Sequence, residues 1–255
     1  MGVHIGYVMN SISPSLAGRL AIFILPALLI PGSMSGCGGG GKGEGLVITR
    51  ANRAQFSQDA TILAARTATG PWIPADTTAA IDLDMAKIRE HYPQVSEIHA
   101  LPDYDLNTLI FGVKTSSPWI NNWRSGVIGT GEAALDDLIH QYDPASIKDK
   151  LFESEGHAWF VLQFGGPLNM TRLSSLFQGK SPNVALAEAN GYIVDGNQIL
   201  LTKAGDNKVY TFSKGWGDCP AGCIHRHSWE FTLKPNATIV LREFGDPLDG
   251  SPGGV

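Results

Sequence analysis

The sequence predicts an α+β protein with a ferredoxin-like core in residues 105–191, followed by an antiparallel β extension. Three observations support this fold class. Strand-like and helix-like patterns alternate through the core in the order β-α-β-β-α-β, the split βαβ arrangement. Only strand patterns follow residue 191. The 219 residues that follow residue 36 (255 − 36) are enough to bury a substantial core.

Residues 1–36 have the pattern of an export signal. Arg19 precedes an apolar stretch over residues 20–30, and small residues then lead to Cys37. The apolar stretch is too short to span a bilayer, which takes roughly 20 apolar residues. A start at Met9 gives a more ordinary leader than a start at Met1, so the chain has two candidate start residues.

The run Met34-Ser35-Gly36-Cys37 resembles the cleavage box of bacterial lipoproteins. This resemblance implies that residues 1–36 are a signal peptide and that Cys37 carries the lipid anchor. Residues 37–45 are rich in glycine and are expected to form a flexible tether. We therefore expect a lipid-anchored protein of the bacterial cell envelope that faces the periplasm or the exterior and takes no cofactor besides this lipid.

The charge balance narrows the class of partner. The formal net charge of −5 becomes −6 without residues 1–36, because Arg19 is the only charged residue among them. No basic cluster suited to nucleic acid is present, and no basic amphipathic helix suited to a membrane surface. We expect membrane contact through the lipid, a protein partner or protease, and no nucleic acid.

The secondary structure of residues 46–104 is only weakly indicated by the sequence. Its first part has little periodicity and is expected to be irregular, with one short helix. Helical spacing then appears at Ile81, Met85, Ile88 and Tyr92, and Pro93 ends the pattern. We predict one amphipathic helix over residues 78–91.

The first half of the core begins with a β-rich run over residues 107–114. A loop with two tryptophans follows. Residues 132–142 are then predicted to form a helix, because Leu135, Leu138, Ile139 and Tyr142 fall on one face. Asp136 and Asp137 are expected on the solvated side of this helix.

The second half of the core is a hairpin, a helix and a strand. Residues 147–154 and 157–164 are predicted to pair around a Glu-Gly turn, with His157 as an ordinary sheet residue. Asn169 is expected to cap the next helix, whose apolar residues share a face. Residues 184–188 are predicted to form the last core strand.

Residues 105–191 resemble the propeptide-inhibitor domain of subtilisin-type proteases. The resemblance rests on the order of elements and on the run Pro-Asn-Val-Ala-Leu-Ala-Glu-Ala-Asn from Pro182 to Asn190. It implies a small sheet that docks on a protease or assists its folding. It also implies that Glu188, on the last strand, makes a polar contact with that partner.

The β extension covers residues 192–244, and a flexible tail over residues 245–255 follows it. Two strand patterns, over residues 197–202 and 208–213, flank a hairpin turn. Two further strands are predicted over residues 225–233 and 238–244. We expect these strands to extend or flank the first sheet.

The sharpest local pattern is Gly-Trp-Gly-Asp-Cys-Pro-Ala-Gly-Cys, from Gly215 to Cys223. It resembles the closing motif of uncharacterised secreted bacterial proteins of the Gly-Trp-Gly-Asp-Cys-Pro-x-Gly-Cys type. The resemblance implies secretion and implies no activity.

Cys219 and Cys223 are expected to form a disulfide, since paired thiols outside the cytoplasm oxidise. Two other uses stay open, a redox-active pair and a metal site that adds His225 and His227. Such a metal site is disfavoured because residues two apart on a strand sit about 7 Å apart. The locked turn is expected to present Trp216 and both histidines to a partner.

These patterns together predict a non-enzymatic lipoprotein that acts as a protein-binding module. The sequence lacks the Gly-x-Ser-x-Gly motif that would indicate a serine hydrolase. One alternative is an inhibitor or propeptide-like chaperone of a subtilisin-type protease. A second alternative is a metal-dependent enzyme built on the two cysteines and two histidines of the motif region.

Overall fold

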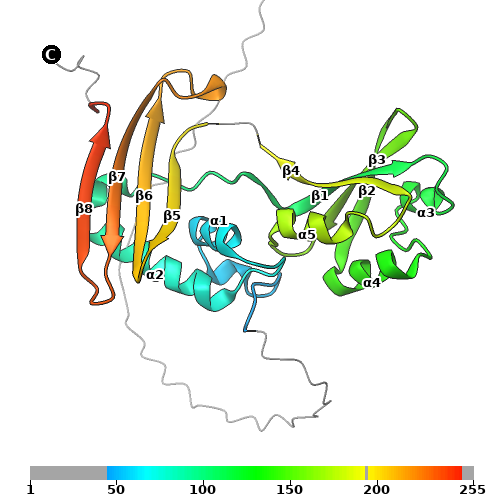
Figure 1. Ribbon diagram of the computed structural model, residues 1–255, viewed down its shortest axis with the longest axis horizontal. Helices are drawn as coiled ribbons and strands as arrows, with labels where there is room; N and C mark the ends of the chain where they lie inside the picture. Colours follow the sequence, from blue (N-terminus) through cyan, green and yellow to red (C-terminus); the bar gives the residue numbers. More distant parts are fainter. Residues whose placement is uncertain (1–44, 193–194, 249–255) are drawn as a thin grey trace, which may run out of the picture. The chain divides into compact units, whose positions relative to one another are not determined.

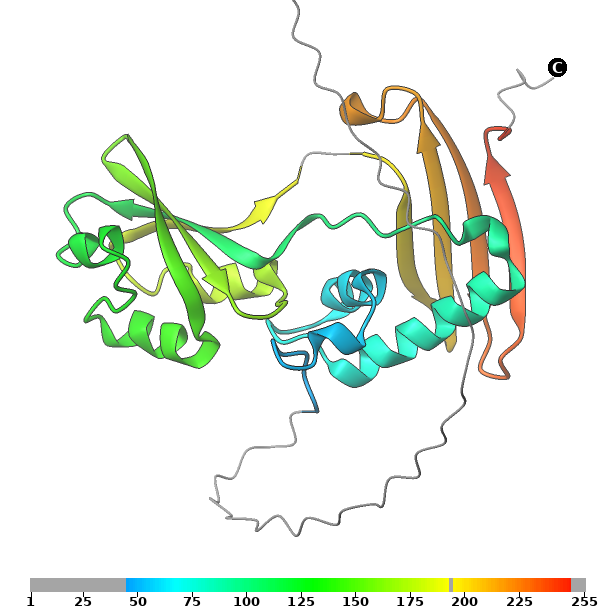
Figure 2. The same cartoon turned by 180° about the vertical axis from the view of Figure 1, so that it is seen from behind.

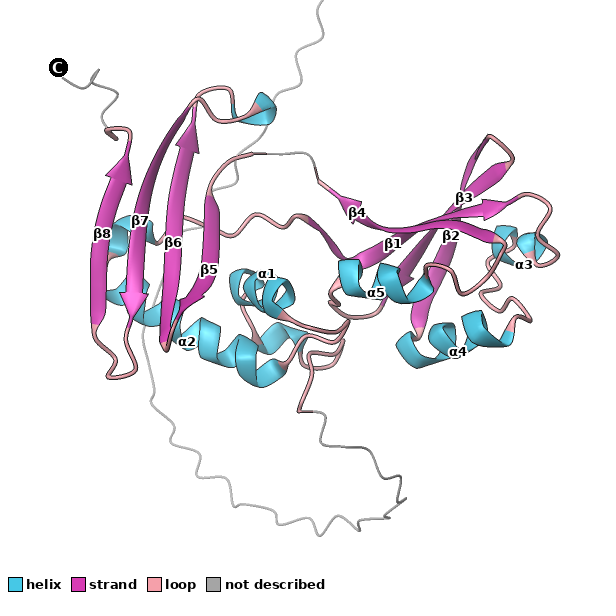
Figure 3. Ribbon diagram, in the orientation of Figure 1, coloured by secondary structure: helices cyan, strands magenta, loops and turns pink. Residues whose placement is uncertain are grey.

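The computed structural model describes residues 45–192 and 195–248 (Figure 1). The predicted signal peptide, the predicted anchor Cys37, the tether as far as residue 44 and the tail from residue 249 lie outside the described residues. The described part of the chain is mixed α+β, with two antiparallel four-stranded sheets and five α-helices (Figure 3).

The first sheet has the strand order β2-β3-β1-β4, and all its neighbouring strands are antiparallel. Helices α3 and α4 lie between β1 and β2 in the sequence, and α5 lies between β3 and β4. The bounds are β1 (Tyr104–Lys114), α3 (Ile120–Arg124), α4 (Ala133–Tyr142), β2 (Pro144–Ser154), β3 (His157–Phe164), α5 (Met170–Phe177) and β4 (Val184–Gly191). The predicted bounds of β3 are confirmed.

The helices cover one face of this sheet (Figure 1). Along β3 every second residue is buried, so that Ala158, Phe160, Leu162 and Phe164 face the helices. In the core, Phe111 of β1 meets Trp123 and Phe177 edge-on, with ring centroids 5.4 and 5.2 Å away. Trp123 belongs to α3, a single short helix in a stretch that the sequence predicts to be a loop.

The start of α4 corrects one expectation. Asp136 is not simply solvated, because its carboxylate accepts hydrogen bonds from the backbone and hydroxyl of Thr130, at 2.8 and 2.7 Å, and from Gly131 N at 2.8 Å. Glu132 accepts from Trp119 Nε1 at 2.6 Å and from Asn183 Nδ2 at 2.7 Å. Burial raises the pKa of both carboxyls, but the hydrogen bonds outweigh it and hold each pKa below its usual value; for Glu132 they include one from the Ser181 side chain.

The C-terminal strands form a sheet of their own, in the order β5-β6-β7-β8. Their bounds are β5 (Gln198–Ala204), β6 (Asn207–Trp216), β7 (His225–Leu233) and β8 (Ile239–Gly245). Each strand pairs with the next along the chain, and Gly205 and Asp206 make the predicted turn between β5 and β6. These strands therefore do not extend the first sheet.

The N-terminal segment packs on this second sheet (Figure 2). Its helices are α1 (Gln58–Thr67) and α2 (Ala75–His91), with short 3₁₀ turns η1 (Arg53–Gln55) and η2 (Pro93–Val95). Tyr92 lies 4.9 Å from Phe231, ring to ring, and the Arg89 guanidinium lies over the Phe212 ring at 5.8 Å. Segments before and after the first sheet thus share one hydrophobic core.

Helix α1 shows why the N-terminal segment has so little periodicity. Every residue from Asp59 to Ala65 is buried, so α1 has no broad polar face to create a helical pattern. Asp59 is compensated by Arg89 at 2.7 Å and by the backbone N–H of Ala100 at 2.8 Å. Ser57 caps the helix by accepting a hydrogen bond from Ala60 N at 3.0 Å.

The side-chain amide of Asn169 makes hydrogen bonds to both halves of the fold. Asn169 caps α5, as predicted, by accepting a hydrogen bond from Arg172 N at 3.0 Å. Its Nδ2 donates to the carbonyls of Ala65 and Ala68 at 2.8 and 3.3 Å, at the C-terminal end of α1. Its Oδ1 also accepts from the Tyr104 hydroxyl at 3.1 Å. Asn169 is 4% exposed, so water cannot easily replace these bonds.

We predict that Asn169→Ala lowers the free energy of unfolding by about 2–4 kcal/mol, because it removes a helix cap and the hydrogen bonds that its amide donates to the buried carbonyls of Ala65 and Ala68. Urea denaturation at constant pH measures the change. The control is Asn190→Ala, at a half-buried position of β4 whose side chain makes no hydrogen bond with the described residues. Equal denaturation midpoints for the two variants would contradict the role given to Asn169.

Candidate functional site

The face of the first sheet opposite the helices is one candidate site, which we call the open face. Its centre consists of half-buried apolar side chains, and charged or polar residues surround them. The centre is Ile110, Trp159, Val161 and Leu186, and the rim is Lys148, His157, Gln163 and Glu188. Alternation along the strands places all eight on the same side of the sheet.

Trp159 is held on the open face by a close approach to the backbone. A Cβ atom added at Gly112 would lie 3.5 Å from the Trp159 ring and 3.4 Å from the Leu186 Cβ. Because glycine has no side chain, the indole packs directly over β1 at Gly112. Its buried Nε1 has no hydrogen-bond partner among the described residues. An aromatic centre with a polar rim is typical of surfaces that contact other proteins.

Glu188 is one of the residues that the sequence singles out, and it lies on this face. It is exposed on β4 and stands in register with Ile110 of β1. The sequence does not identify Trp159 as a site residue, because an aromatic residue on an alternating strand is equally compatible with a buried position.

The second candidate site is the end of the second sheet that carries the motif. Cys219 and Cys223 lie at disulfide distance, as predicted, across the 3₁₀ turn η3 (Cys219–Ala221). Trp216 and His225 stand opposite each other on β6 and β7, and their rings stack with centroids 5.5 Å apart and planes at 25°. The disulfide turn is therefore flanked by two stacked aromatic rings, one on each strand.

Both predicted histidines are engaged with other residues. His225 Nδ1 lies 3.4 Å from a carboxylate oxygen of Asp246, and His227 Nδ1 lies 2.8 Å from the Asp246 carbonyl. The His227 Nε2 is buried and lies 3.7 Å from a Glu243 carboxylate oxygen, without a hydrogen-bond partner among the described residues. Within residues 45–192 and 195–248, no group of three or more His, Cys, Asp and Glu side chains is placed to hold a metal ion.

Asp195, which precedes β5 in the sequence, contacts the disulfide turn. Its carboxylate accepts a hydrogen bond from Cys223 N at 2.8 Å and pairs with Arg226 at 2.5 Å. The Cys223 N–H, then Arg226, hold the pKa of this carboxyl below its usual value. Nothing in the sequence distinguishes Asp195 from a solvated turn residue.

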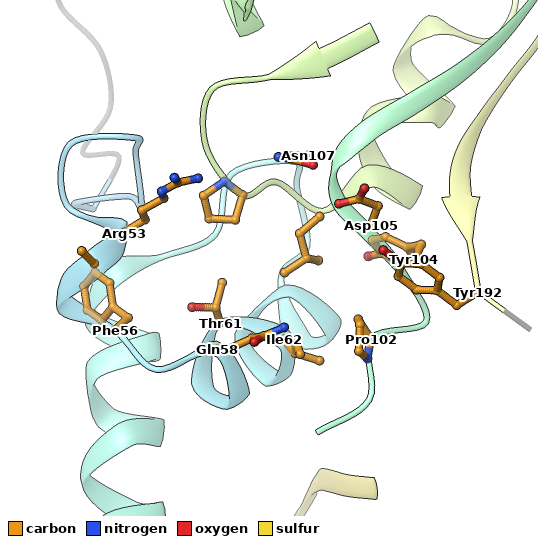
Figure 4. A pocket seen from close by; sticks show the side chains of 13 residues that line it. Arg53, Phe56, Gln58, Thr61, Ile62, Pro102, Tyr104, Asp105, Asn107 and Tyr192 are labelled. Carbon is orange, nitrogen blue, oxygen red and sulfur yellow. The ribbon is translucent and has the colours of Figure 1, made fainter. Parts of the chain in front are cut away.

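The third candidate is a cavity of about 460 Å³ where η1 and α1 meet the start of β1 (Figure 4). It is lined by Arg53, Ala54, Phe56, Gln58, Thr61, Ile62, Pro102, Tyr104, Asp105, Leu106, Asn107, Pro167 and Tyr192. Burial raises the pKa of the Tyr104 hydroxyl. The sequence could not predict this cavity, because its walls come from segments that lie far apart along the chain.

No protein-family model, curated protein or solved structure matches this chain. The two family resemblances drawn from the sequence therefore stay predictions. Across the described ranges, none of the helices has both the length and the apolar character needed to cross a membrane.

We predict that Gly215→Ala destabilises the motif end of the second sheet. The added methyl group would collide with the Cys223 sulfur and would lie 3.0 Å from the Gly196 carbonyl oxygen. The expected loss in free energy of unfolding is about 1–3 kcal/mol, the usual effect of overpacking. Urea denaturation without reductant measures it.

The matched control is Gly196→Ala, because a Cβ atom there meets nothing within 4 Å. It should leave the denaturation midpoint unchanged. If both variants had the midpoint of the unaltered protein, Cys223 would not be fixed against Gly215 as described.

Proposed function

We propose that this chain is a non-enzymatic lipoprotein of a bacterial cell envelope that binds a protein partner through the open face of its first sheet. The run Met34-Ser35-Gly36-Cys37 supports the anchor and the compartment. The observation that carries the binding proposal is the sheet itself. Its helices cover one face, and the opposite face carries Trp159 among half-buried aliphatic residues.

The composition of the open face favours a protein over a small molecule. Its residues lie on neighbouring antiparallel strands and form a sheet surface, and they do not line any of the described cavities. Burying its apolar centre against a partner would stabilise the complex by about 25 cal/mol for each Å² of apolar surface removed from water. The charges of Lys148 and Glu188 at opposite edges of the sheet would orient the partner.

The finer fold is part of the same proposal. We propose that the first sheet and its helices form a ferredoxin-like module. The order β2-β3-β1-β4, with helices between β1 and β2 and between β3 and β4, supports it. The stacked Trp216 and His225 would add a second contact area at the motif end of the other sheet.

Site-specific photocrosslinking in the producing cell tests the open face. A photoreactive phenylalanine analogue in place of Val161 should give one adduct of defined mass in the membrane fraction. The same analogue in place of Leu200, which is 46% exposed on the second sheet, is the control. Glu188→Lys should reduce the adduct several-fold because it reverses a rim charge. Equal adducts from both positions, or none, would contradict the proposal.

A second candidate is inhibition of a subtilisin-type protease. The strand order of the first sheet supports it, together with the exposed position of Glu188 on the last strand of that sheet. An inhibitor would use the open face to dock on the protease and would itself resist cleavage.

We predict that the intact protein slows peptide hydrolysis by such a protease at about 1 μM, with Glu188→Ala weakening inhibition at least several-fold. Gel analysis would check that the chain stays uncleaved. The control is Glu97→Ala, at an exposed position before β1. Undiminished hydrolysis at this concentration would reject the inhibitor candidate and leave the protein-binding proposal in place.

A further inference from the structure

The cavity of Figure 4 carries opposite charges on two sides. Among the described residues, only Arg53 and Asp105 are charged residues that line it. Arg53 comes from η1 and Asp105 from β1, and Figure 4 draws them on opposite sides of the group of lining residues. The two side chains form no ion pair with each other. The cavity therefore offers one site for a negative group and one for a positive group.

The side that carries Asp105 suits an ammonium group. Tyr104 and Tyr192 line the same cavity, and Figure 4 draws both on the side of Asp105. The Tyr104 ring is held by its hydroxyl, which donates to Asn169 Oδ1 at 3.1 Å. The backbone of Tyr192 is held by its N–H, which donates to the Asp103 carbonyl at 3.0 Å, while its side chain is exposed. A carboxylate with neighbouring aromatic rings binds a primary ammonium group by charge and by cation–π attraction.

The side that carries Arg53 suits a carboxylate. The Arg53 side chain is exposed and has no hydrogen bond or ion pair within the described residues. A guanidinium group can bind a carboxylate through two parallel hydrogen bonds. Arg53 is thus available for such an anion without the loss of an existing contact.

The space between the charges suits a peptide unit with an apolar side chain. Ile62, Leu106 and Pro167 contribute apolar surface. Gln58 makes no side-chain hydrogen bond with the described residues, and Asn107 uses only its oxygen, which accepts from Thr108 at 3.1 Å. Amide donors are therefore available in the wall. A volume of about 460 Å³ lies in the range of small-ligand sites.

We propose that this cavity binds a short peptide with free amino and carboxyl ends and an apolar side chain. Arg53 holds the carboxylate, while Asp105 with Tyr104 and Tyr192 holds the ammonium group. This site does not depend on the open face, so it goes beyond the proposed function, and either proposal can fail without the other.

Isothermal titration calorimetry of the full-length protein tests the site with L-alanyl-L-phenylalanine as probe. The free dipeptide should bind, while the N-acetyl form and the C-terminal amide should each bind at least about tenfold more weakly, because each lacks one charge. L-phenylalanine, which cannot supply the peptide unit, should also bind more weakly than the dipeptide.

Two substitutions assign the ends of the ligand. Arg53→Gln should abolish the preference for the free carboxylate over the amide and keep the preference for the free amine. Asp105→Asn should do the reverse, and its amide oxygen can still accept the hydrogen bond that Thr108 donates to Asp105 at 3.1 Å. The control is Arg50→Gln, a neighbouring exposed arginine that lines a different cavity, which should bind like the unaltered protein.

Several results would overturn the proposal. These are no saturable binding of the free dipeptide up to about 10 mM, equal affinity for free and blocked forms, or tighter binding of L-phenylalanine than of the dipeptide. An effect of Arg50→Gln as large as that of Arg53→Gln would overturn it as well, because the loss would then reflect general charge.

Discussion

The side-chain amide of Asn169 is the contact on which the arrangement of the two cores depends. Its nitrogen donates hydrogen bonds to two buried carbonyls at the C-terminal end of α1. Its oxygen caps α5 and also accepts a hydrogen bond from the Tyr104 hydroxyl at the start of β1. Arg66 acts beside it, with bonds to Asp103, to the Leu101 carbonyl at 2.6 Å and to the Ile199 carbonyl at 3.0 Å. Because buried polar groups need partners, these two side chains specify one way of joining the halves.

This junction explains how a chain that leaves one core can return to it. Helices α1 and α2 cover the second sheet, although the whole first sheet lies in the sequence between these helices and strands β5–β8. Both crossings are fixed near the same place, since Arg66 bonds residues before β1 and also the carbonyl of Ile199 in β5. The second core is therefore built from segments on both sides of the first sheet, and the contacts of Arg66 bring β5 back to α1.

The sequence predicted local elements well and their partners poorly. Strands β3 and β7 have the predicted bounds, because alternation on a half-buried strand is a strong signal. One short helix was expected before residue 78, but α1 could not be located because it is buried on nearly all sides, and α3 was missed because five residues are too few for a period. The pairing of N-terminal helices with C-terminal strands, and the cavity lined by Arg53 and Asp105, depend on contacts between distant segments. No local pattern records such contacts.

Strand β1 contributes to both proposed surfaces, but different interactions hold its two ends. Its register with β4 shifts between Tyr104 and Leu109, so the ladder is interrupted where β1 lines the cavity. There the strand is held by the Leu168 N–H, which donates to the Leu106 carbonyl at 2.7 Å, and by the contacts at Asp103. From Leu109 onward β1 pairs continuously with β3, and this regular part carries the open face. The cavity thus takes its shape from the junction and the open face from the sheet, which makes the two surfaces separable by substitution.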